Sequence, residues 1–472
     1  NQYINQRIMN TIKQINYAKI SSVPVSAATC FTWHAAKGAF ARLNPPFAPV
    51  QILEEPDELK AGAEVLIKVP TPFPFFGIKW RLTHPEYVEG QYFRDTQIKG
   101  PFKSWEHTHN FKEIDSTNSE MEDVLKFSLP FGILGKLFGA PIVKKQLSAL
   151  FNYRHSILKM DMETLKSNNE PLHILIAGSS GLIGTALTPY FTTQGHKVTQ
   201  LLRSEGEKSE GLEYWDYENQ TTTINSNQTF DVIIHLGGVN LAGGKWTNKR
   251  KTQMLKSRTE STSFLSEIIT GLKTEPKVFL CASAVGIYGT TDSDPREEDS
   301  PKGDLYSSMI VAEWEKATKR VSDAGIRVVN LRFGMVLSPL GGALKKFLLP
   351  AKMGVGGKLG NGRNLISWIS MEDVLGVVTH SINNEQVVGP LNVVANDMYS
   401  NKGLIKTICK VLKRPCLFPV PALILIALFG KQMAKETIFV NTSVSNEKLI
   451  KSGYEFKLPE LEGALRHMLG KV

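Results

Sequence analysis

The chain has 472 residues, of which 42% are hydrophobic and 21% are charged, so it has ample material for a packed core. At about 100–200 residues per domain, this length predicts two to four domains. The formal net charge is +10, but the basic residues are dispersed and no nucleic-acid-binding motif accompanies them, so we expect no nucleic-acid partner.

The apolar runs are too short or too interrupted for a membrane-spanning helix, which needs about 20 apolar residues. The two nearest candidates are Leu129–Val143 and Val420–Phe429, and we expect both to be buried core, with contact to a bilayer surface as the alternative. The first residues lack a basic-then-apolar signal pattern, and the four cysteines show no paired or metal-type spacing. We therefore expect a cytoplasmic protein with free thiols.

Residues 1–162 are predicted to form an α+β domain. Val65–Val69, Ile78–Leu82 and Gln91–Asp95 have the composition of strands between Pro/Gly turns. The apolar positions from Val143 to Leu158 recur at helical spacing, which predicts a long amphipathic helix. The polar segment 163–171 is predicted to be a linker.

From Leu172 the pattern changes, because short apolar runs now alternate with helical segments. We expect strands at His173–Ala177, Lys197–Leu202, Asp231–Leu236, Lys277–Cys281 and Ile326–Leu331, and helices at Lys249–Thr270 and Ser307–Ala324. This alternation predicts an α/β Rossmann domain, a doubly wound parallel sheet, over residues 172–399. Residues 400–472 are predicted to form a small α-rich C-terminal domain on the substrate side.

A glycine-rich segment follows the first strand of this region and opens a helix. It reads Gly178-Ser179-Ser180-Gly181-Leu182-Ile183-Gly184. Glycines at this spacing let the backbone turn sharply and approach a pyrophosphate, which the free N–H groups of the helix N-terminus bind. The segment therefore predicts a nicotinamide dinucleotide site, and a strand–turn–helix without a ligand is the alternative.

The second strand ends at Arg203 instead of an acidic residue. An acidic residue at this point binds the ribose hydroxyls of NAD, whereas an arginine suits the 2′-phosphate of NADP. We therefore predict NADP(H) as the preferred cofactor, with NAD(H) as the second choice. Arg203 as an ordinary surface cation is the alternative.

Further motifs follow along the same region. They are His235–Gly243, Lys245–Thr247, Lys256–Arg258, Ser283–Gly289, Leu331–Ser338, Gly360–Arg363, Ser367–Ile369, Glu372-Asp373, Arg414-Pro415, Val420-Pro421 and Gly453–Phe456. Together with the glycine segment, they resemble the extended short-chain dehydrogenase/reductase superfamily. Within it they are similar to the branch of predicted NAD-dependent nucleoside-diphosphate-sugar epimerases, which carries a small C-terminal domain.

This resemblance implies roles for individual residues. Near the adenosine side of the cofactor it places Leu236, Gly237 and Gly238. Near the nicotinamide it places Phe333, Gly334 and Val336. Along the substrate pocket it places Arg363 and Trp368. A plain loop at Gly237–Gly238 and a core position for Trp368 are the alternatives.

The catalytic machinery typical of short-chain dehydrogenases is incomplete in this sequence. These enzymes use a serine, a tyrosine that delivers a proton, and a lysine four residues after that tyrosine. Tyr306 stands where the tyrosine belongs, but Ile310 occupies the lysine position. Ser283 lies one residue away from the strict serine position, which Ala284 occupies.

Two classes of function remain open on this basis. The first is an NADP(H)-dependent oxidoreductase or epimerase that acts on a small molecule, with Tyr288 or Lys245 as a further proton donor. The second is a non-catalytic NADP(H)-sensing protein. Extended dehydrogenases often form homodimers, so we take a homodimer as the expected assembly.

The N-terminal region carries a second resemblance. Its residues are Phe31–His34, Trp80, Phe93–Phe102, Trp105–Phe111, Leu129–Gly132 and Phe151–His155. They resemble the START/polyketide-cyclase-like helix-grip superfamily, which implies a curved antiparallel sheet around a long helix and a cavity for a hydrophobic ligand. Our hypothesis is that this cavity captures an apolar substrate, which the Rossmann domain reduces or isomerises with NADP(H).

Two features of this region have open interpretations. His107 and His109 lie on one face of a strand, but no third ligand is evident in the sequence, so we expect a structural pair and no metal. The aromatic segment from Pro70 to Phe76 is either a lid over the cavity or a rigid hairpin loop.

Overall fold

The structure is a computed structural model that describes residues 14–70, 77–130, 135–166, 170–203, 209–292 and 294–471. The chain divides into two compact units. Unit 1 comprises Asn1–Glu170, Pro189–Gly195 and His467–Val472, and unit 2 comprises Pro171–Thr188 and His196–Arg466. None of the described helices is both long enough and apolar enough to cross a membrane.

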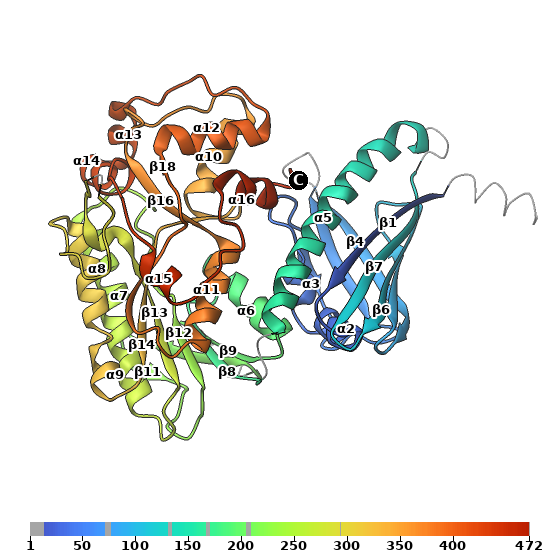
Figure 1. Cartoon of the computed structure of the whole chain (residues 1–472), viewed down its shortest axis with the longest axis horizontal. Helices are drawn as coiled ribbons and strands as arrows, with labels where there is room; N and C mark the ends of the chain where they lie inside the picture. The colour runs from blue at the N-terminus through green and yellow to red at the C-terminus, as the bar shows by residue number, and fades with distance from the viewer. Residues whose placement is uncertain are drawn as a thin grey trace, which may run out of the picture. The chain divides into compact units, whose positions relative to one another are not determined.

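Unit 1 is built on an antiparallel sheet of seven strands in the order β1-β7-β6-β5-β4-β3-β2 (Figure 1). The strands are β1 (Ile15–Val23), β2 (Gln51–Glu54), β3 (Glu64–Pro70), β4 (Gly77–Val88), β5 (Tyr92–Lys99), β6 (Ser104–Asp115) and β7 (Asn118–Ser128). The helical elements are α2 (Ala27–Ala35), α3 (Ala39–Arg42), η1 (Gly135–Gly139) and α5 (Ala140–Leu165). Helix α5 therefore enters the segment 163–171 that the sequence predicts as a linker.

The buried face of this sheet follows from strict alternation along the strands. On β7 the odd-numbered residues from Ser119 to Phe127 are buried while most of their neighbours are only partly covered, as the two-residue period of a strand requires. Helix α5 covers this face, and its Leu147 and Phe151 pack in one core cluster with Phe127. The aromatic segment predicted as a lid lies almost entirely outside the described residues, which resume at Gly77.

Large side chains fill the interior of unit 1. Trp33, Phe127 and Phe151 are each less than 2% exposed. A second core cluster contains Phe31, Phe93, Phe111, Met121 and several residues of α5. The face between the sheet and α5 is therefore packed with protein side chains.

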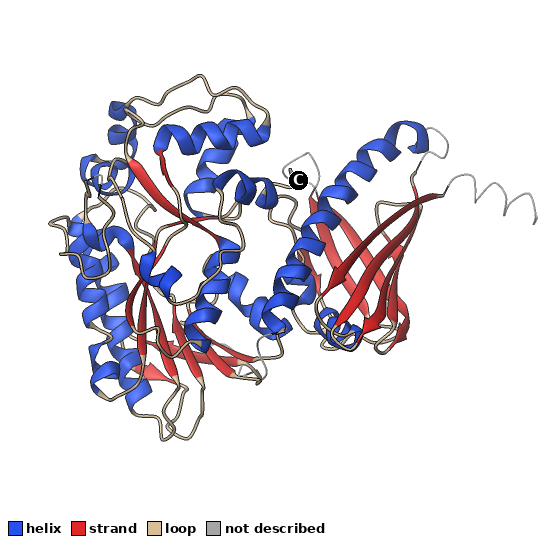
Figure 2. Cartoon of the chain, viewed as in Figure 1, coloured by secondary structure: helices blue, strands red, loops and turns tan. Residues whose placement is uncertain are grey.

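Unit 2 is built on an eight-stranded sheet in the order β11-β10-β9-β8-β12-β13-β14-β17. Figure 2 shows its strands in red and its helices in blue. Its strands are β8 (His173–Ala177), β9 (Lys197–Leu202), β10 (Leu212–Asp216), β11 (Thr221–Thr222), β12 (Val232–His235), β13 (Val278–Ala284), β14 (Val328–Phe333) and β17 (Gly389–Val393). Seven of these strands pair in parallel, and only β11 is antiparallel to its neighbour. The Rossmann-type fold predicted for this region is confirmed.

A smaller sheet and the remaining helices complete unit 2. The small sheet contains β15 (Met335–Leu337), β16 (Leu365–Ser370) and β18 (Met398–Ser400). The main helices are α6 (Gly184–Thr193), η2 (Val285–Tyr288), α7 (Asn248–Thr270), α8 (Tyr306–Lys316), α9 (Lys319–Asp323), α10 (Gly342–Lys352) and α11 (Met371–Asn383). The C-terminal part adds α12 (Asn401–Leu412), α13 (Ala422–Phe429), α14 (Lys431–Met433), η3 (Ala434–Ile438), α15 (Glu447–Lys451) and α16 (Leu461–Met468). The ends of α6, from Pro189, and of α16, from His467, belong to unit 1.

The described residues of both apolar runs predicted as buried core are largely exposed, so that prediction is wrong for them. On α13, Leu423 is 79% exposed and Leu428 is 62% exposed. In the described part of the other run, Leu137, Phe138 and Ile142 are each more than 60% exposed. Composition alone does not tell an apolar helix that packs in the core from one that lies on the surface.

Candidate functional site

The glycine segment forms a tight loop between β8 and α6. Gly178 has a φ of +84°, which favours glycine, and a Cβ there would lie 2.9 Å from the backbone nitrogen of Gly237. A Cβ on Gly184 would lie 2.4 Å from the carbonyl oxygen of Gly178. The loop therefore leaves no room for side chains at these two positions, and its backbone N–H groups line the start of α6.

Several polar groups of this loop lack partners in the described part of the chain. The hydroxyl of Ser179 is buried and has no hydrogen-bond partner there. The backbone N–H groups of Leu182 and Ile183 likewise meet no acceptor among the described residues. A buried hydroxyl and free N–H donors at a helix N-terminus form a donor set suited to an anionic group.

The loop after β12 lies directly beside the glycine loop. The backbone N–H of Leu236 donates to the carbonyl oxygen of Ala177 at 2.8 Å, and β12 pairs in parallel with β8. Because β9 lies on the other side of β8, the strand order reverses at this point. Ligands of doubly wound sheets bind at such a reversal, outside the carboxyl ends of the strands.

Two side chains of α7 hold the loop after β12 in place, and no role was predicted for either from the sequence. Ser257 accepts a hydrogen bond from the Val239 N–H at 3.1 Å. Arg258 donates to the Val239 carbonyl oxygen at 3.1 Å, and a Cβ on Gly238 would lie 3.0 Å from its Cζ. Burial lowers the pKa of Arg258 to about 10, so it remains a cation at neutral pH. Its place in the Lys256–Arg258 motif was the available signal.

The residues predicted near the nicotinamide lie at the same edge of the sheet. Phe333 ends β14, and Val336 lies in β15 opposite Ile369 of β16. Gly334 passes so close to β16 that a Cβ would lie 2.7 Å from the Ser367 carbonyl oxygen. Since β8, β12, β13 and β14 are parallel neighbours, their carboxyl ends form one continuous edge along which an extended dinucleotide fits.

Arg203 lies at the end of β9, next to β8. It is exposed, and no ion pair or hydrogen bond occupies its guanidinium within the described ranges. An exposed and unengaged guanidinium at this strand end is available to a phosphate group.

Ser283 and Tyr288 belong to one buried hydrogen-bond network. The Ser283 hydroxyl donates to Glu315 at 2.5 Å. Arg332 binds both carboxylate oxygens of Glu315 at 2.8 Å and donates to the Tyr288 hydroxyl at 2.7 Å. The Tyr288 hydroxyl in turn donates to Asn392 at 2.7 Å, and burial raises its pKa to about 12. Both hydroxyls predicted as catalytic are therefore already engaged.

Tyr306 has different neighbours, and no contact in the described chain joins it to Ser283 or Tyr288. It begins α8, as predicted, and its hydroxyl donates to the carbonyl oxygen of Lys251 at 3.0 Å. The Lys251 Nζ lies 5.1 Å from the centre of the Tyr306 ring. Burial raises the pKa of Tyr306, and the carboxylate of Glu436 adds to this rise. The phenol is therefore protonated at neutral pH.

The two residues implied for the substrate pocket differ in exposure. Arg363 is exposed in the loop before β16. Trp368 is fully buried in β16, opposite Met335 of β15. A side chain without exposed surface does not touch a substrate. Trp368 therefore occupies the core, which was the alternative to the implied place in the pocket.

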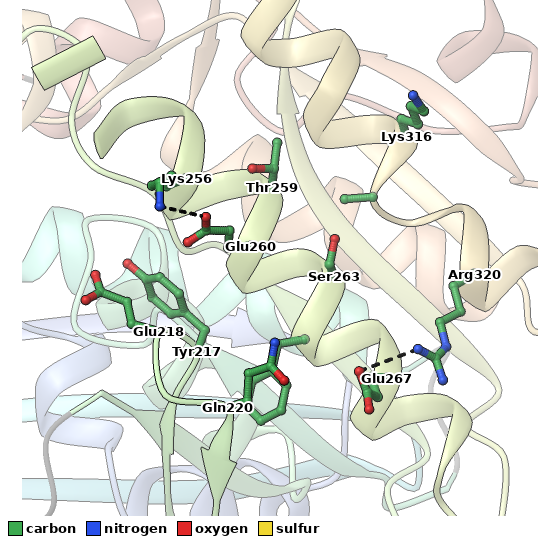
Figure 3. Close-up of a pocket in the computed structure, with 12 residues that line it drawn as sticks. Tyr217, Glu218, Gln220, Lys256, Thr259, Glu260, Ser263, Glu267, Lys316 and Arg320 are labelled. Atoms are coloured by element: carbon green, nitrogen blue, oxygen red, sulfur yellow. Dashed lines mark ion pairs between the residues drawn. The ribbon is translucent and has the colours of Figure 1, made fainter. Parts of the chain in front are cut away.

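A broad groove on unit 2 lies over α7 and next to α8 and α9 (Figure 3). Four of its charged residues form two ion pairs: Lys256 with Glu260 at 3.1 Å, and Arg320 with Glu267 at 3.5 Å (Figure 3). No residue of the glycine loop lines it. Solvated ion pairs of this kind contribute little, and we assign the groove no role in cofactor binding.

Comparison with known proteins gives the family. The model of the NAD dependent epimerase/dehydratase family matches residues 174–394, and the model of a domain of unknown function, DUF1731, matches residues 420–468. The human epimerase family protein SDR39U1 is 31% identical over 301 residues, which are 63% of this chain and 100% of that protein. The chain belongs to the NAD dependent epimerase/dehydratase family. The epimerase family protein YfhF of Bacillus subtilis is 34% identical over 301 residues, 63% of this chain and 98% of that protein.

Two solved structures are also similar to this epimerase-family chain. The crystal structure of the nucleoside-diphosphate sugar epimerase from Corynebacterium glutamicum is 28% identical, covers 96% of this chain and 90% of its own, and has a TM-score of 0.75. The structure of human SDR39U1 with NADPH is 31% identical, covers 63% of this chain and 99% of its own, and has a TM-score of 0.59. The match to the Corynebacterium glutamicum structure covers 96% of this chain, so it includes unit 1.

Proposed function

We propose that this epimerase-family chain is an NADP(H)-dependent oxidoreductase or epimerase that acts on a small molecule. The observation that carries the proposal is the loop between β8 and α6, where a Cβ on Gly178 or Gly184 would overlap backbone atoms. Unpartnered donors and the reversal of strand order meet at the same place. These features fit a dinucleotide pyrophosphate, which Ser179 and the start of α6 would hold.

Two observations support NADP(H) over NAD(H). Arg203 presents an unengaged guanidinium at the end of β9 in the described chain, and the structure of the human relative contains NADPH. A charge-assisted hydrogen bond contributes about 1.5–3 kcal/mol, which is roughly a 10- to 100-fold difference in affinity. Arg203→Asp should therefore weaken NADPH binding at least 10-fold in calorimetry and change NADH binding little.

A matched charge change separates this effect from general electrostatics. Arg320→Asp makes the same charge change on α9, at an exposed position, and should leave both nucleotides bound as in the unmodified chain. Equal losses of NADPH and NADH affinity in Arg203→Asp would contradict the proposed contact with the 2′-phosphate.

Tyr306 is the proton donor in this proposal. When bound, the cofactor supplies a hydride to a carbonyl carbon, and the Tyr306 hydroxyl gives its proton to the carbonyl oxygen. Its raised pKa suits an acid better than a base, because the phenol keeps its proton at neutral pH. With Ile310 in place of a lysine, this arrangement favours the reductive direction.

The test of this role separates chemistry from binding. Tyr306→Phe should lower NADPH-dependent turnover by about 10²–10⁴-fold and leave NADPH affinity unchanged, measured over a panel of carbonyl compounds. Tyr217→Phe, in the groove over α7, is the matched control and should retain full activity. Full activity in Tyr306→Phe would contradict the assignment.

A non-catalytic NADP(H) sensor is the second candidate, and one observation favours it. The Ser283 hydroxyl is engaged by Glu315 and Ile310 stands at the lysine position, so Tyr306 lacks the usual serine and lysine partners. Its own hydroxyl also donates to the Lys251 carbonyl oxygen. Tight NADPH binding without turnover over the whole carbonyl panel would support the sensor. Measurable turnover that Tyr306→Phe abolishes would exclude it.

Capture of an apolar substrate by unit 1 is a separate hypothesis. The resemblance to helix-grip proteins supports it, whereas the packing of Trp33, Phe127 and Phe151 in the interior weighs against it. Native mass spectrometry of the purified full chain tests it directly. A co-purified hydrophobic molecule would support capture, and a chain that carries only nucleotide would oppose it.

A further inference from the structure

A cluster of ionisable side chains lies inside unit 1, and no step proposed above uses it. Asp95 comes from β5, His107 and His109 from β6, Asp123 from β7 and His155 from α5. Asp95, His107, Asp123 and His155 are each at most 7% exposed. Burying such groups rarely adds stability over apolar side chains of similar volume, so their presence in a packed interior calls for a functional reason.

Strand register brings these side chains together. Asp95 lies directly opposite His107, and His109 lies directly opposite Asp123. His107 and His109 are two residues apart on β6, so their side chains share one face of the sheet. Opposite residues on adjacent antiparallel strands have Cβ atoms about 4.5–5.5 Å apart, which is close enough for their side chains to meet at one point.

Three donor atoms converge at that point. The Oδ2 of Asp95 lies 3.0 Å from the Nδ1 of His107 and 3.8 Å from the Nε2 of His109. One ligand atom from each of these residues lies within 4.8 Å of the others. An ion with bonds of about 2.1 Å keeps its ligand atoms roughly 3–3.5 Å apart, so small side-chain adjustments suffice to accommodate one.

The remaining polar atoms of the three residues are occupied by outer partners. The indole N–H of Trp105 donates to the Oδ1 of Asp95 at 2.9 Å, so it is Oδ2 that faces the two histidines. The Oδ1 of Asp123 lies 2.8 Å from both His107 Nε2 and His109 Nδ1, although only the contact with His107 is aligned as a hydrogen bond. A carboxylate behind each histidine is the usual outer arrangement of metal-binding histidines.

We infer that Asp95, His107 and His109 bind a divalent first-row transition-metal ion of the Zn²⁺, Fe²⁺ or Mn²⁺ class. Two histidines and one carboxylate form a donor set that such ions accept with open positions left over. Asp123 orients the histidines in this arrangement, and His155 fixes Asp123 through a 2.8 Å hydrogen bond. The two buried carboxylates also offset the charge of the ion.

A small cavity borders the same cluster. It is lined by His34, His109, Asp123, Arg154, His155 and three apolar residues. Because His109 and Asp123 belong to both the cavity wall and the cluster, a single water in this space would lie next to the proposed site.

The test uses the full chain, freed of metal with a chelator and then titrated separately with Zn²⁺, Mn²⁺ and Co²⁺. Equilibrium dialysis with elemental analysis should give about one ion per chain. Two single variants are compared with the unmodified chain. Asp95→Asn keeps an oxygen for Trp105 but removes the charge, and His109→Gln removes one of the two imidazole ligands. Each variant should bind the metal about 100-fold more weakly or worse. The visible absorption of the Co²⁺-loaded chain should vanish in both variants.

His380→Gln is the control, because His380 lies in α11 of unit 2 and bonds the Ser452 hydroxyl at 2.8 Å. It should bind metal within about threefold of the unmodified chain. Circular dichroism and NADPH binding confirm folding of each variant. X-ray absorption of the Zn²⁺-loaded unmodified chain, which needs no variant, should show the multiple-scattering signature of two imidazole ligands.

Two results would overturn the inference. One is only trace binding of all three ions by the folded, unmodified chain, which would leave the cluster as a hydrogen-bond network. The other is stoichiometric binding that Asp95→Asn and His109→Gln leave unchanged, which would place the ion elsewhere.

Discussion

The glycines of the loop after β8 differ in what each position requires. Gly184 is needed for space, because a Cβ would lie 2.4 Å from a backbone oxygen. Gly178 is needed for both space and conformation, since its φ is +84° and its surroundings are backbone atoms of the loop after β12. A substitution at Gly178 therefore pushes two cofactor-site loops apart.

Gly178→Ala should abolish measurable NADPH binding, because the added methyl group displaces the loop after β12. Gly325 is the matched control: its φ is +89°, but nothing lies within 4 Å of a Cβ there. Both variants carry the strain of a left-handed alanine, about 1 kcal/mol, but only Gly178→Ala should lose the cofactor. Thermal shift on NADPH addition measures the difference, and retained binding in Gly178→Ala would contradict the predicted overlap.

Glu315 and Arg332 form the central pair of the network that engages Ser283 and Tyr288. Their side chains are 14% and 7% exposed, so Glu315→Ala leaves a buried cation without its partner. We expect a loss of about 3–5 kcal/mol in the free energy of unfolding, measured by urea denaturation. Asp323→Ala breaks the exposed pair with Lys319 and should cost less than about 1 kcal/mol. Similar losses in the two variants would contradict a structural role for the network.

The sequence predicted the glycine loop well but not the engagement of Ser283. The loop depends on neighbouring residues, and its context of strand and helix is visible in a short segment. Ser283 is held by Glu315, which is 32 positions away, and Glu315 is held by Arg332. Contacts across such separations depend on how β13, β14 and α8 pack, and no local pattern records that packing.

At the scale of elements, apolar periodicity predicted the five strands β8, β9, β12, β13 and β14 and the helix α7 to within a few residues. It missed the other strands of unit 2, and the single helix predicted over Ser307–Ala324 is the pair α8 and α9. It failed at α13, where an entirely apolar helix has the same composition on the surface as in a core. The exposure of α13 depends on which elements pack against it, and apolar periodicity does not report packing partners.

Helix α11 begins with a buried cap whose contribution can be measured. The Ser370 hydroxyl accepts from the Asp373 N–H at 3.0 Å and donates to the Asp373 carboxylate at 2.6 Å. Ser370→Ala removes both bonds, so we expect a loss of about 1–2 kcal/mol in the free energy of unfolding. Thr247→Ala at the exposed start of α7, where one hydrogen bond is lost, should cost about half as much. Equal costs would show that burial of the cap is unimportant.

At the scale of the whole chain, the change of pattern near Leu172 predicted that an α+β region is followed by a Rossmann region. The proposed metal ligands were not predictable as a set. His107 and His109 were visible as a pair, but Asp95 and Asp123 come from different strands and become neighbours only through strand register. Each unit thus holds one candidate ligand site, and the two sites differ in chemistry.

This difference predicts where each ligand protects the backbone. A ligand that binds the folded state slows exchange of the amides it stabilises, so NADPH should slow hydrogen–deuterium exchange at 178–184 and 236–238. A divalent ion should instead slow exchange in β5, β6 and β7, whose residues supply the proposed ligands and their outer partner. Mass spectrometry of peptides from the full chain, with each ligand added alone, measures both patterns.

The Asp95→Asn variant should lose the second pattern and keep the first, because Asp95 belongs to unit 1 and the glycine loop to unit 2. Protection of β5–β7 by NADPH alone would contradict this separation of the two sites.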